Sequence, residues 1–324
     1  MRVMNGQPGL PPFETVLKSR EVEDPVNLWV HRPLAYAFVA LVYRTPITPN
    51  QVTFLSLLAG FAAAVCFVVG TPATMFAGGC LLWSSAILDG ADGILARAKR
   101  IFSDVGRAID GVTDAAVAAM TVFAGFYHVW VQFHSPLHLA LMPIALFGSI
   151  VQIYLYDFYK EAYMQHTNPA WNGVAERVED VKARLLALRA EGAPWYARFS
   201  TLLHVGVLEN QMRVVTLTNP AGLRAHLNFP VSEKSIEIYR RNNAGLMQLW
   251  AALSLAPHCY GMSICAMFDR QDVYLWLRFS LANVLMVVAF IWQRRATRRV
   301  LDELAEAGLA PVPAAATHVA GAPA

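Results

Sequence analysis

The stretch LDGADGILARAKRIFSDVGRAIDGVTDAA, residues 88–116, decides how this chain folds and what it can do. It places Asp89 and Asp92 three residues apart near the end of one apolar run, and Asp110 and Asp114 four residues apart near the start of the next. Residues three or four apart lie on one face of a helix, about 5–6 Å apart along its axis. Because two helices joined by a short turn run antiparallel, we expect the two carboxylate pairs to face each other at one depth.

The composition places these carboxylates in a membrane protein. Of the 324 residues, 56% are hydrophobic and 15% are charged, whereas a soluble protein has about 25% charged residues. The net charge of +3 gives no reason to expect a nucleic-acid partner. The four cysteines lie in apolar runs without metal-ligand spacing, which is typical of small buried hydrophobic residues. We therefore expect an all-α integral membrane protein.

Six apolar runs approach the ~20 residues that a helix needs to cross a bilayer. The runs cover residues 49–70, 73–96, 107–132, 137–158, 243–268 and 271–293. We expect six transmembrane helices, preceded by an amphipathic helix over 26–44 that lies on the membrane surface or forms a short extra span. Lys and Arg gather between spans two and three, between spans four and five, and after span six. This distribution predicts that those segments and both termini are cytoplasmic.

The remaining segments set the predicted domain limits. Residues 1–25 form a polar lead without the layout of a secretory signal, and residues 26–300 form the membrane domain. Within that domain, residues 160–240 are too polar and too long for an ordinary connection, so they form a cytoplasmic helical insertion between spans four and five. Residues 301–324, rich in Ala, Pro and Gly, are predicted to be disordered.

One amphipathic helix is predicted inside the insertion. Val181 and Leu185 belong to an apolar series over 174–188 with spacings of three and four, and Glu179 can pair with Lys182 on the other side. We expect this helix to lie on the cytoplasmic face as a packing or dimerisation element.

Four carboxylates in a membrane require a compensating charge. Each costs about 2.5–3.5 kcal/mol near the centre of a span, or on the order of 10 kcal/mol for four unpaired groups. Arg97 and Arg107 can neutralise part of this charge, and Asp104 reads as a loop charge or helix cap. Four hard oxygen donors at one depth are better matched by divalent cations, and two Mg²⁺ ions about 3.5–4 Å apart bind the oxygens of an in-line displacement at phosphorus. The pattern predicts a metal site and a phosphate substrate.

Eight residues of this stretch match a family signature. They are Asp89, Asp92, Gly93, Ala96, Arg97, Gly106, Asp110 and Asp114, which reproduce D-x2-D-G-x2-A-R-x8-G-x3-D-x3-D, the signature of the CDP-alcohol phosphotransferases. The segment ITPNQVTFLSLLAG (47–60) also resembles the family's usual entry to its first span. The resemblance covers about 30–160 and 240–295, but not the insertion.

The resemblance implies a homodimeric six-helix membrane enzyme that cleaves the pyrophosphate of a CDP-linked donor, passes the phospho-alcohol to an acceptor hydroxyl and releases CMP. It implies two divalent ions, Mg²⁺ or Mn²⁺, as cofactors. Asp89, Asp92 and Asp110 would be metal ligands, and Asp114 would be both a ligand and the general base. The CDP site would be lined by Gly93, Ala96, Arg97 and Gly106, with Asn50 and Thr53 close by.

The substrates stay open at this point. One reading has a CDP-lipid donor such as CDP-diacylglycerol and a small polar alcohol or alcohol phosphate as acceptor, in phospholipid biosynthesis. The other has a CDP-polar-alcohol donor and a lipid acceptor. The compact layout favours a bacterial or archaeal cell membrane. A membrane prenyltransferase and a transporter with intramembrane carboxylates are remote alternatives, because all four aspartates lie on consecutive spans and no second carboxylate cluster accompanies them.

Three further sites carry weaker expectations. Arg240 and Arg241 either receive an anionic acceptor or only set the topology. His128, with its neighbours at 134 and 138, is expected at the non-cytoplasmic interface, and His258 is expected to be a hydrogen-bonded core residue.

Overall fold

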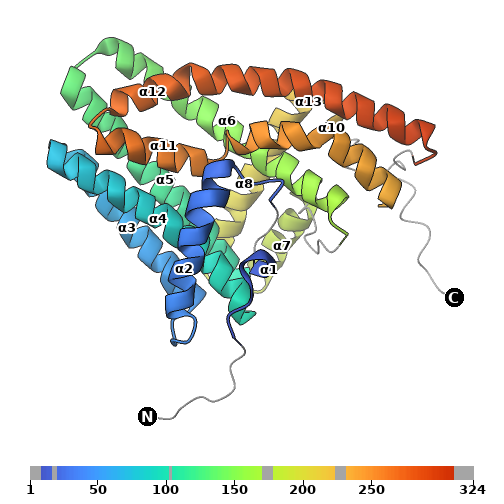
Figure 1. Cartoon of the computed structure of the whole chain (residues 1–324), viewed down its shortest axis with the longest axis horizontal. Helices are drawn as coiled ribbons and strands as arrows, with labels where there is room; N and C mark the ends of the chain where they lie inside the picture. Colours follow the sequence, from blue (N-terminus) through green and yellow to red (C-terminus); the bar gives the residue numbers. More distant parts are fainter. Residues whose placement is uncertain (1–8, 17–19, 102–103, 170–177, 223–230, 310–324) are drawn as a thin grey trace, which may run out of the picture. The chain divides into compact units, whose positions relative to one another are not determined.

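A computed structural model describes the chain and shows helices throughout the described part (Figure 1). The described residues are 9–16, 20–101, 104–169, 178–222 and 231–309. The chain divides into two compact units, Met1–Phe147 with Leu255–Leu281 and Gly148–Ser254 with Ala282–Ala324. Four helical segments among the described residues are long and apolar enough to cross a membrane: Pro49–Val69, Ile109–Phe133, Pro136–Thr167 and Gln271–Glu306. The predicted all-α membrane protein is confirmed at this level.

The first unit begins with short elements that pack on a long helix. These are α1 (Phe13–Val16), the π-helix η1 (Asn27–His31) and α2 (Arg32–Val42). The buried face of α2, with Ala35 and Val39, joins one apolar cluster with Ala91 and Ile94 of α4 (Pro72–Lys99). The predicted amphipathic helix over 26–44 is therefore helical over 27–42, and α2 contacts the helix that carries the first aspartate pair.

Two helices of the first unit begin with the same local signals. In α3 (Pro49–Val69) and in α4, a threonine caps the first turn and a proline follows it. Thr48 accepts from the Gln51 backbone N–H while the Gln51 side chain accepts from the Thr48 N–H, which satisfies two otherwise unpaired donors. Gly70 closes α3 with a φ of 69°, a conformation that glycine adopts without strain.

Helix α4 ends in a left-handed cap after the first aspartate pair. Arg100 has a φ of 55°, and the Ile101 N–H donates to the Ala96 carbonyl at 3.0 Å, which ends α4 in a left-handed cap. The next helix, α5 (Asp104–Phe133), packs against α3. A Cβ atom on Gly60 of α3 would lie 2.6 Å from a methyl group of Val117, so this glycine is needed for the close approach of the two helices.

Two short helices complete the first unit, α11 (Leu255–Met267) and α12 (Gln271–Phe279). Their side chains Met262 and Tyr274 join an apolar cluster with Phe67 of α3 and Leu82 of α4. The unit thus encloses α4 between α2, α3 and α11.

The second unit contains most of the insertion. It is formed by the later part of α6 (Pro136–Thr167), with α7 (Val178–Ala190), α8 (Trp195–Thr218), α10 (Glu233–Ala251) and α13 (Leu281–Glu306). Tyr159 of α6 stacks on Trp250 of α10 at a centroid distance of 5.3 Å, and the Trp250 Nε1–H donates to Gln293 of α13 at 2.9 Å. These contacts join three helices through one aromatic side chain.

The structure differs from one of the predicted spans. The run over 243–268 is not one helix, because α10 ends at Ala251 and α11 begins at Leu255. Pro257 accounts for the break, since its ring conflicts with the carbonyl four residues earlier. The run over 271–293 lies within the candidate span Gln271–Glu306, which has a local break at Ser280 between α12 and α13.

Two further expectations need correction. Residues 301–306, predicted as the start of a disordered tail, belong to α13, where Leu304 is fully buried. The tail beyond residue 309 lies outside the described residues. In the insertion, the predicted helix is observed as α7, but Lys182 pairs with Glu209 of α8 at 2.7 Å, a partner on a different helix from Glu179.

Candidate metal centre

The two aspartate pairs meet as their spacing predicts. Asp89, Asp92 and Asp110 each offer a carboxylate oxygen, and these three atoms lie within 4.8 Å of one another. The Asp114 carboxyl group is hydrogen bonded to that of Asp89. Four acidic groups from α4 and α5 therefore form one cluster, defined here as the acidic cluster.

Hydroxyl groups of α3 support the acidic cluster from the side. Thr53 Oγ donates to the Asp92 carboxylate, and Thr53 itself is buried. One turn further along, Ser56 Oγ donates to the Ser85 carbonyl of α4 at 3.0 Å, and Ser85 Oγ donates back to the Ser56 carbonyl at 2.9 Å. Thr53 therefore lies beside Asp92 of the acidic cluster. Asn50 is exposed near the start of α3, one turn before Thr53.

The small residues of the signature lie beside the carboxylates. A Cβ atom on Gly93 would stand 3.4 Å from Arg97 Nη1, so the Arg97 guanidinium covers this part of α4. Ala96 is half-buried in the last turns of α4, and Gly106 is half-buried one turn before Asp110 on α5. A Cβ atom on Gly111 would meet nothing within 4 Å, so tight packing does not explain that glycine.

Two basic side chains of α4 bind backbone carbonyls of other segments. Arg97 Nε donates to the Val16 carbonyl at 2.5 Å. Lys99 Nζ donates to the Thr45 and Ile47 carbonyls at 2.9 and 2.7 Å, in the connection between α2 and α3. Of the other basic and acidic residues considered in the turn, Arg107 and Asp104 have side chains outside the described part of the structure.

A polar group of N-terminal residues lies beside α4, and sequence reasoning missed it. Arg32 forms a nearly buried ion pair with Glu23 at 2.9 Å and reaches the Gly90 carbonyl at 3.4 Å, between the first two aspartates. Asp24 accepts a hydrogen bond from the Tyr260 hydroxyl of α11 at 3.0 Å. Glu23, Asp24 and Arg32 lie in the segment predicted as polar lead and surface helix, where charge alone suggested contact with water.

Burial changes the titration of two side chains in this group. Removal from water raises the pKa of Asp24 above its usual value. Burial, together with the nearby Arg32 guanidinium, lowers the pKa of His31 to about 4. The His31 ring is held edge to face against Trp83 and Tyr260, at centroid distances of 4.7 and 5.7 Å.

The remaining predicted polar residues lie in separate contacts. His128 Nε2 is 2.8 Å from Asp269 Oδ1, and His258 hydrogen bonds with the Tyr274 hydroxyl, as expected for a core histidine. Arg241 pairs with Glu303 at 2.6 Å. These contacts give no second cluster of metal ligands among the described residues.

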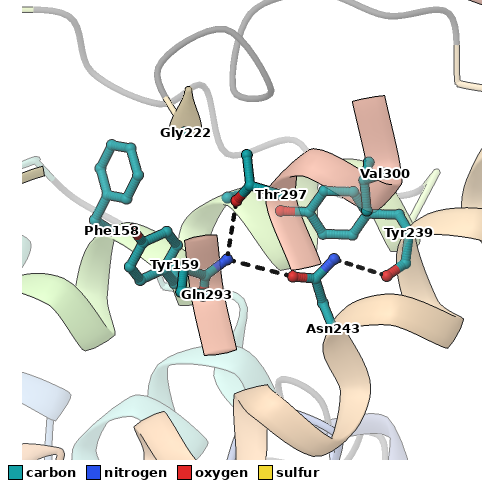
Figure 2. Close-up of a pocket in the computed structure, with 9 residues that line it drawn as sticks. Phe158, Tyr159, Gly222, Tyr239, Asn243, Gln293, Thr297 and Val300 are labelled. Atoms are coloured by element: carbon teal, nitrogen blue, oxygen red, sulfur yellow. Dashed lines mark hydrogen bonds between the residues drawn. The ribbon is translucent and has the colours of Figure 1, made fainter. Parts of the chain in front are cut away.

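A small cavity in the second unit is lined by neutral polar and aromatic groups (Figure 2). Gln293 Nε2 lies 3.4 Å from both Asn243 Oδ1 and Thr297 Oγ, and Asn243 Nδ2 donates to the Tyr239 carbonyl at 2.9 Å. The free volume is about 10 Å³, which accommodates one water molecule at most. The amides that form it lie in predicted spans, where buried polar residues are a recognisable signal. We do not assign substrate binding to this cavity.

The acidic cluster has the donors that a divalent cation requires. Carboxylate oxygens this close together repel one another unless a proton or a cation lies between them. Mg²⁺ and similar hard ions prefer such oxygen ligands. Gly93 follows Asp92 directly in α4, and the side chain that covers it is the Arg97 guanidinium. The arrangement therefore suits a metal-assisted reaction of a phosphate group.

Comparison with known proteins identifies one domain of this chain. Residues 46–202 match the CDP-alcohol phosphatidyltransferase family, a family of enzymes. The resemblance drawn from the signature is confirmed for this domain. The match runs past residue 160 into the insertion, further than predicted, and it does not include the predicted region over 240–295.

Three similar curated proteins are named bifunctional IPC transferase and DIPP synthase. The protein of Thermococcus kodakarensis is 31% identical over 117 residues, covering 36% of this chain and 26% of the relative. Those of Aquifex aeolicus and Archaeoglobus fulgidus are 36% and 30% identical, over 122 and 119 residues. Both matches cover 36% of this chain, but only 26% and 22% of the respective relative. The matched part thus spans about a quarter of these relatives.

Proposed function

We propose that this enzyme transfers a phospho-alcohol group from a CDP-linked donor to an acceptor hydroxyl and releases CMP. The observation that carries the proposal is the approach of Asp89, Asp92 and Asp110 to within 4.8 Å, from two consecutive helices. The family match supports the reaction class, because CDP-alcohol phosphatidyltransferases act on CDP-linked donors and use divalent metals.

The acidic cluster would hold two divalent ions, Mg²⁺ or Mn²⁺. Asp89, Asp92, Asp110 and Asp114 are the proposed ligands. When bound, the ions supply positive charge that offsets the charge developing on the departing CMP. Thr53 holds the Asp92 carboxylate in a fixed orientation through its hydroxyl, so that this ligand is preorganised.

The other residues of the signature would bind the nucleotide and move the proton. Asp114 is the proposed general base that takes the proton of the acceptor hydroxyl as the new bond to phosphorus forms. Gly93, Ala96 and Gly106 leave room for the diphosphate and ribose beside the helix backbones. Arg97, whose guanidinium covers Gly93, would donate hydrogen bonds to the donor phosphates.

We place the active site at the cytoplasmic face of a cell membrane, in a homodimer with six spans per chain. Four spans meet the length and composition criteria. The α4 helix, 28 residues long, would be a fifth despite its charges. The basic residues at the ends of the spans support this orientation. Bacterial and archaeal relatives support a bacterial or archaeal membrane.

For substrates, we propose a CDP-lipid donor such as CDP-diacylglycerol and a small polar alcohol or alcohol phosphate as acceptor. This assignment places the enzyme in phospholipid biosynthesis. The second candidate is a CDP-polar-alcohol donor with a lipid acceptor.

The test is CMP release by purified protein in detergent, with Mg²⁺ or Mn²⁺, a panel of CDP-linked donors and a panel of alcohols, with products identified by mass. Replacement of Asp89, Asp92 or Asp110 by Asn should lower the rate by at least about 100-fold, because each ligand supports several kcal/mol of charge stabilisation. Asp302→Asn, an exposed change on α13, is the matched control and should leave the rate unchanged. Full activity in the presence of a chelator, or in the ligand variants, would contradict the proposal.

Asp114→Asn separates the roles of base and ligand. If Asp114 is the base, the variant should retain measurable Mn²⁺ binding by electron paramagnetic resonance while its rate of CMP release collapses. An active Asp114→Asn variant would remove the assignment as base and leave the other three ligands in place.

A further inference from the structure

The insertion folds as a helical hairpin whose inner faces cover each other. Val181 and Leu185 of α7 form a buried cluster with Val205 of α8. Lys182 of α7 and Glu209 of α8 close the pair with an ion pair of 2.7 Å. The amphipathic face of α7 is therefore occupied by α8.

The outer face of α8 is apolar and exposed. Trp195, Phe199, Leu202, Leu203 and Val207 expose 71%, 53%, 47%, 50% and 40% of their surface. The first four fall within an arc of about 100° at the helical repeat, which is the width of one amphipathic face. A soluble surface rarely concentrates large apolar side chains in this way.

Cationic side chains accompany this face along α8. From residue 195 to residue 207, Arg198 is the only charged side chain, and no acidic residue occurs. Arg213, also exposed, lies five turns after Trp195 on the same side of the helix. The acidic Glu209 in the later half of α8 is neutralised by Lys182. The outer face therefore combines apolar side chains with cationic neighbours.

Contacts with α6 and α13 hold the later part of α8 in place. The Gln211 amide donates to the Tyr154 carbonyl of α6 at 2.8 Å, and Arg294 of α13 donates to the Leu217 carbonyl at 3.2 Å. Tyr154 follows Pro136, the first residue of α6, by eighteen residues, or about 27 Å of helix. Because the hydrocarbon core is about 30 Å thick, Tyr154 lies near the level at which α6 leaves it.

We propose that the outer face of α8 docks on the anionic lipid surface of the cytosolic leaflet. Trp195, Phe199 and Leu203 insert among the headgroups and upper acyl chains, and Arg198 lies close to lipid phosphates. Lipid is favoured over a second copy of the chain because Arg198 and Arg213 accompany the apolar side chains, while Glu209 of the same helix is paired with Lys182. This proposal is independent of the transferase chemistry, which involves none of these residues.

The test uses full-length protein in nanodiscs, with the four native cysteines replaced by alanine and one cysteine introduced for an environment-sensitive fluorophore. Leu203→Cys and Phe199→Cys report on the outer face, and Asp180→Cys, exposed on α7, is the matched control. Brominated lipids should quench the two outer-face probes at least about twofold and leave the control unaffected. Quenching should increase with the fraction of anionic lipid and decrease when Arg198→Glu is added.

Three results would overturn the proposal. Outer-face probes as accessible to aqueous iodide as the control would show a surface in water. Weak quenching together with disulfide crosslinking through Leu203→Cys would show that a second copy covers the face. Quenching that does not change with the fraction of anionic lipid would show that anionic lipid does not attract this face, which contradicts the proposal. Circular dichroism and gel filtration of each labelled variant confirm that the reporter positions leave the fold intact.

Discussion

Replacement of Gly79 by alanine tests whether the close approach of α4 and α11 fixes the helix that carries the first aspartate pair. A Cβ atom at this position would lie 2.6 Å from the Ser263 carbonyl oxygen and 2.7 Å from Met267 Cγ. Ordinary contacts begin near 3.4 Å, and a backbone carbonyl in a helix cannot rotate away as a side chain can. The two helices must therefore separate by several tenths of an ångström.

The expected loss of stability follows from two opposing effects. Overpacking of a close contact costs about 1–3 kcal/mol, and the rigid backbone neighbour favours the upper end of this range. Alanine recovers about 1 kcal/mol of helix propensity relative to glycine. The net loss should be about 2 kcal/mol, or about 4–8 °C in apparent melting temperature. Because α4 shifts with its carboxylates, the rate of CMP release should also fall by about tenfold or more.

Thermal unfolding in detergent and CMP release measure the two effects on the same preparation. Gly206→Ala on α8 is the matched control, since a Cβ atom there meets nothing within 4 Å and should raise stability by up to about 1 kcal/mol. A Gly79→Ala protein that is as stable and as active as the parent would refute the reasoning, because the two helices would then tolerate separation without cost.

Two further predictions concern the groups around α4. Burial lowers the pKa of His31 to about 4. Below pH 6.5 the folded state therefore binds fewer protons than the unfolded state. The free energy of unfolding that is present above pH 6.5 is lost as the pH falls towards 4. The loss in the free energy of unfolding is at most about 3 kcal/mol. The denaturation midpoint of His31→Asn should change less between pH 6.5 and pH 4 than that of the parent. An equal pH dependence of the two midpoints would contradict the prediction. Lys99→Met removes both hydrogen bonds to the Thr45 and Ile47 carbonyls and should cost about 1–3 kcal/mol. Lys99→Arg should retain part of that stability, and a melting temperature unchanged in Lys99→Met would show that the two contacts contribute nothing.

The acidic cluster could be predicted from the sequence because its geometry is local. Spacings of three and four place each aspartate pair on one helix face, and a short turn brings the two helices together. The turn itself was expected, but its form was not, because Arg100 adopts a left-handed conformation that glycine or asparagine usually supplies. The break between α10 and α11 could have been inferred from Pro257. The apolar composition of residues 243–268 nevertheless led to the prediction of one continuous helix.

The N-terminal group could not be predicted in the same way, because its partners are distant in the sequence. Glu23 and Arg32 read as charges of a polar lead and a surface helix. In the structure they are buried together against Gly90, 58 residues further along the chain from Arg32. Glu23 and Arg32 are buried only because α2 packs against α4. No periodicity in residues 20–44 predicts that contact. Local patterns indicate which side chains share a face, but not which remote backbone will cover that face.

The low hydropathy of α4 follows from its place in the fold. It is absent from the segments that are apolar enough to cross a membrane, although it is 28 residues long. Asp89, Asp92 and the basic side chains of its last turns account for this low value. The helix is packed against α2, α3 and α11, so its polar groups bind to protein groups such as the Thr53 hydroxyl and the Val16 carbonyl. A polar helix at membrane depth is tolerated where neighbouring helices satisfy it. The aspartates can therefore be held close together on a rigid backbone, which is the geometry that a metal-assisted transfer at phosphorus requires.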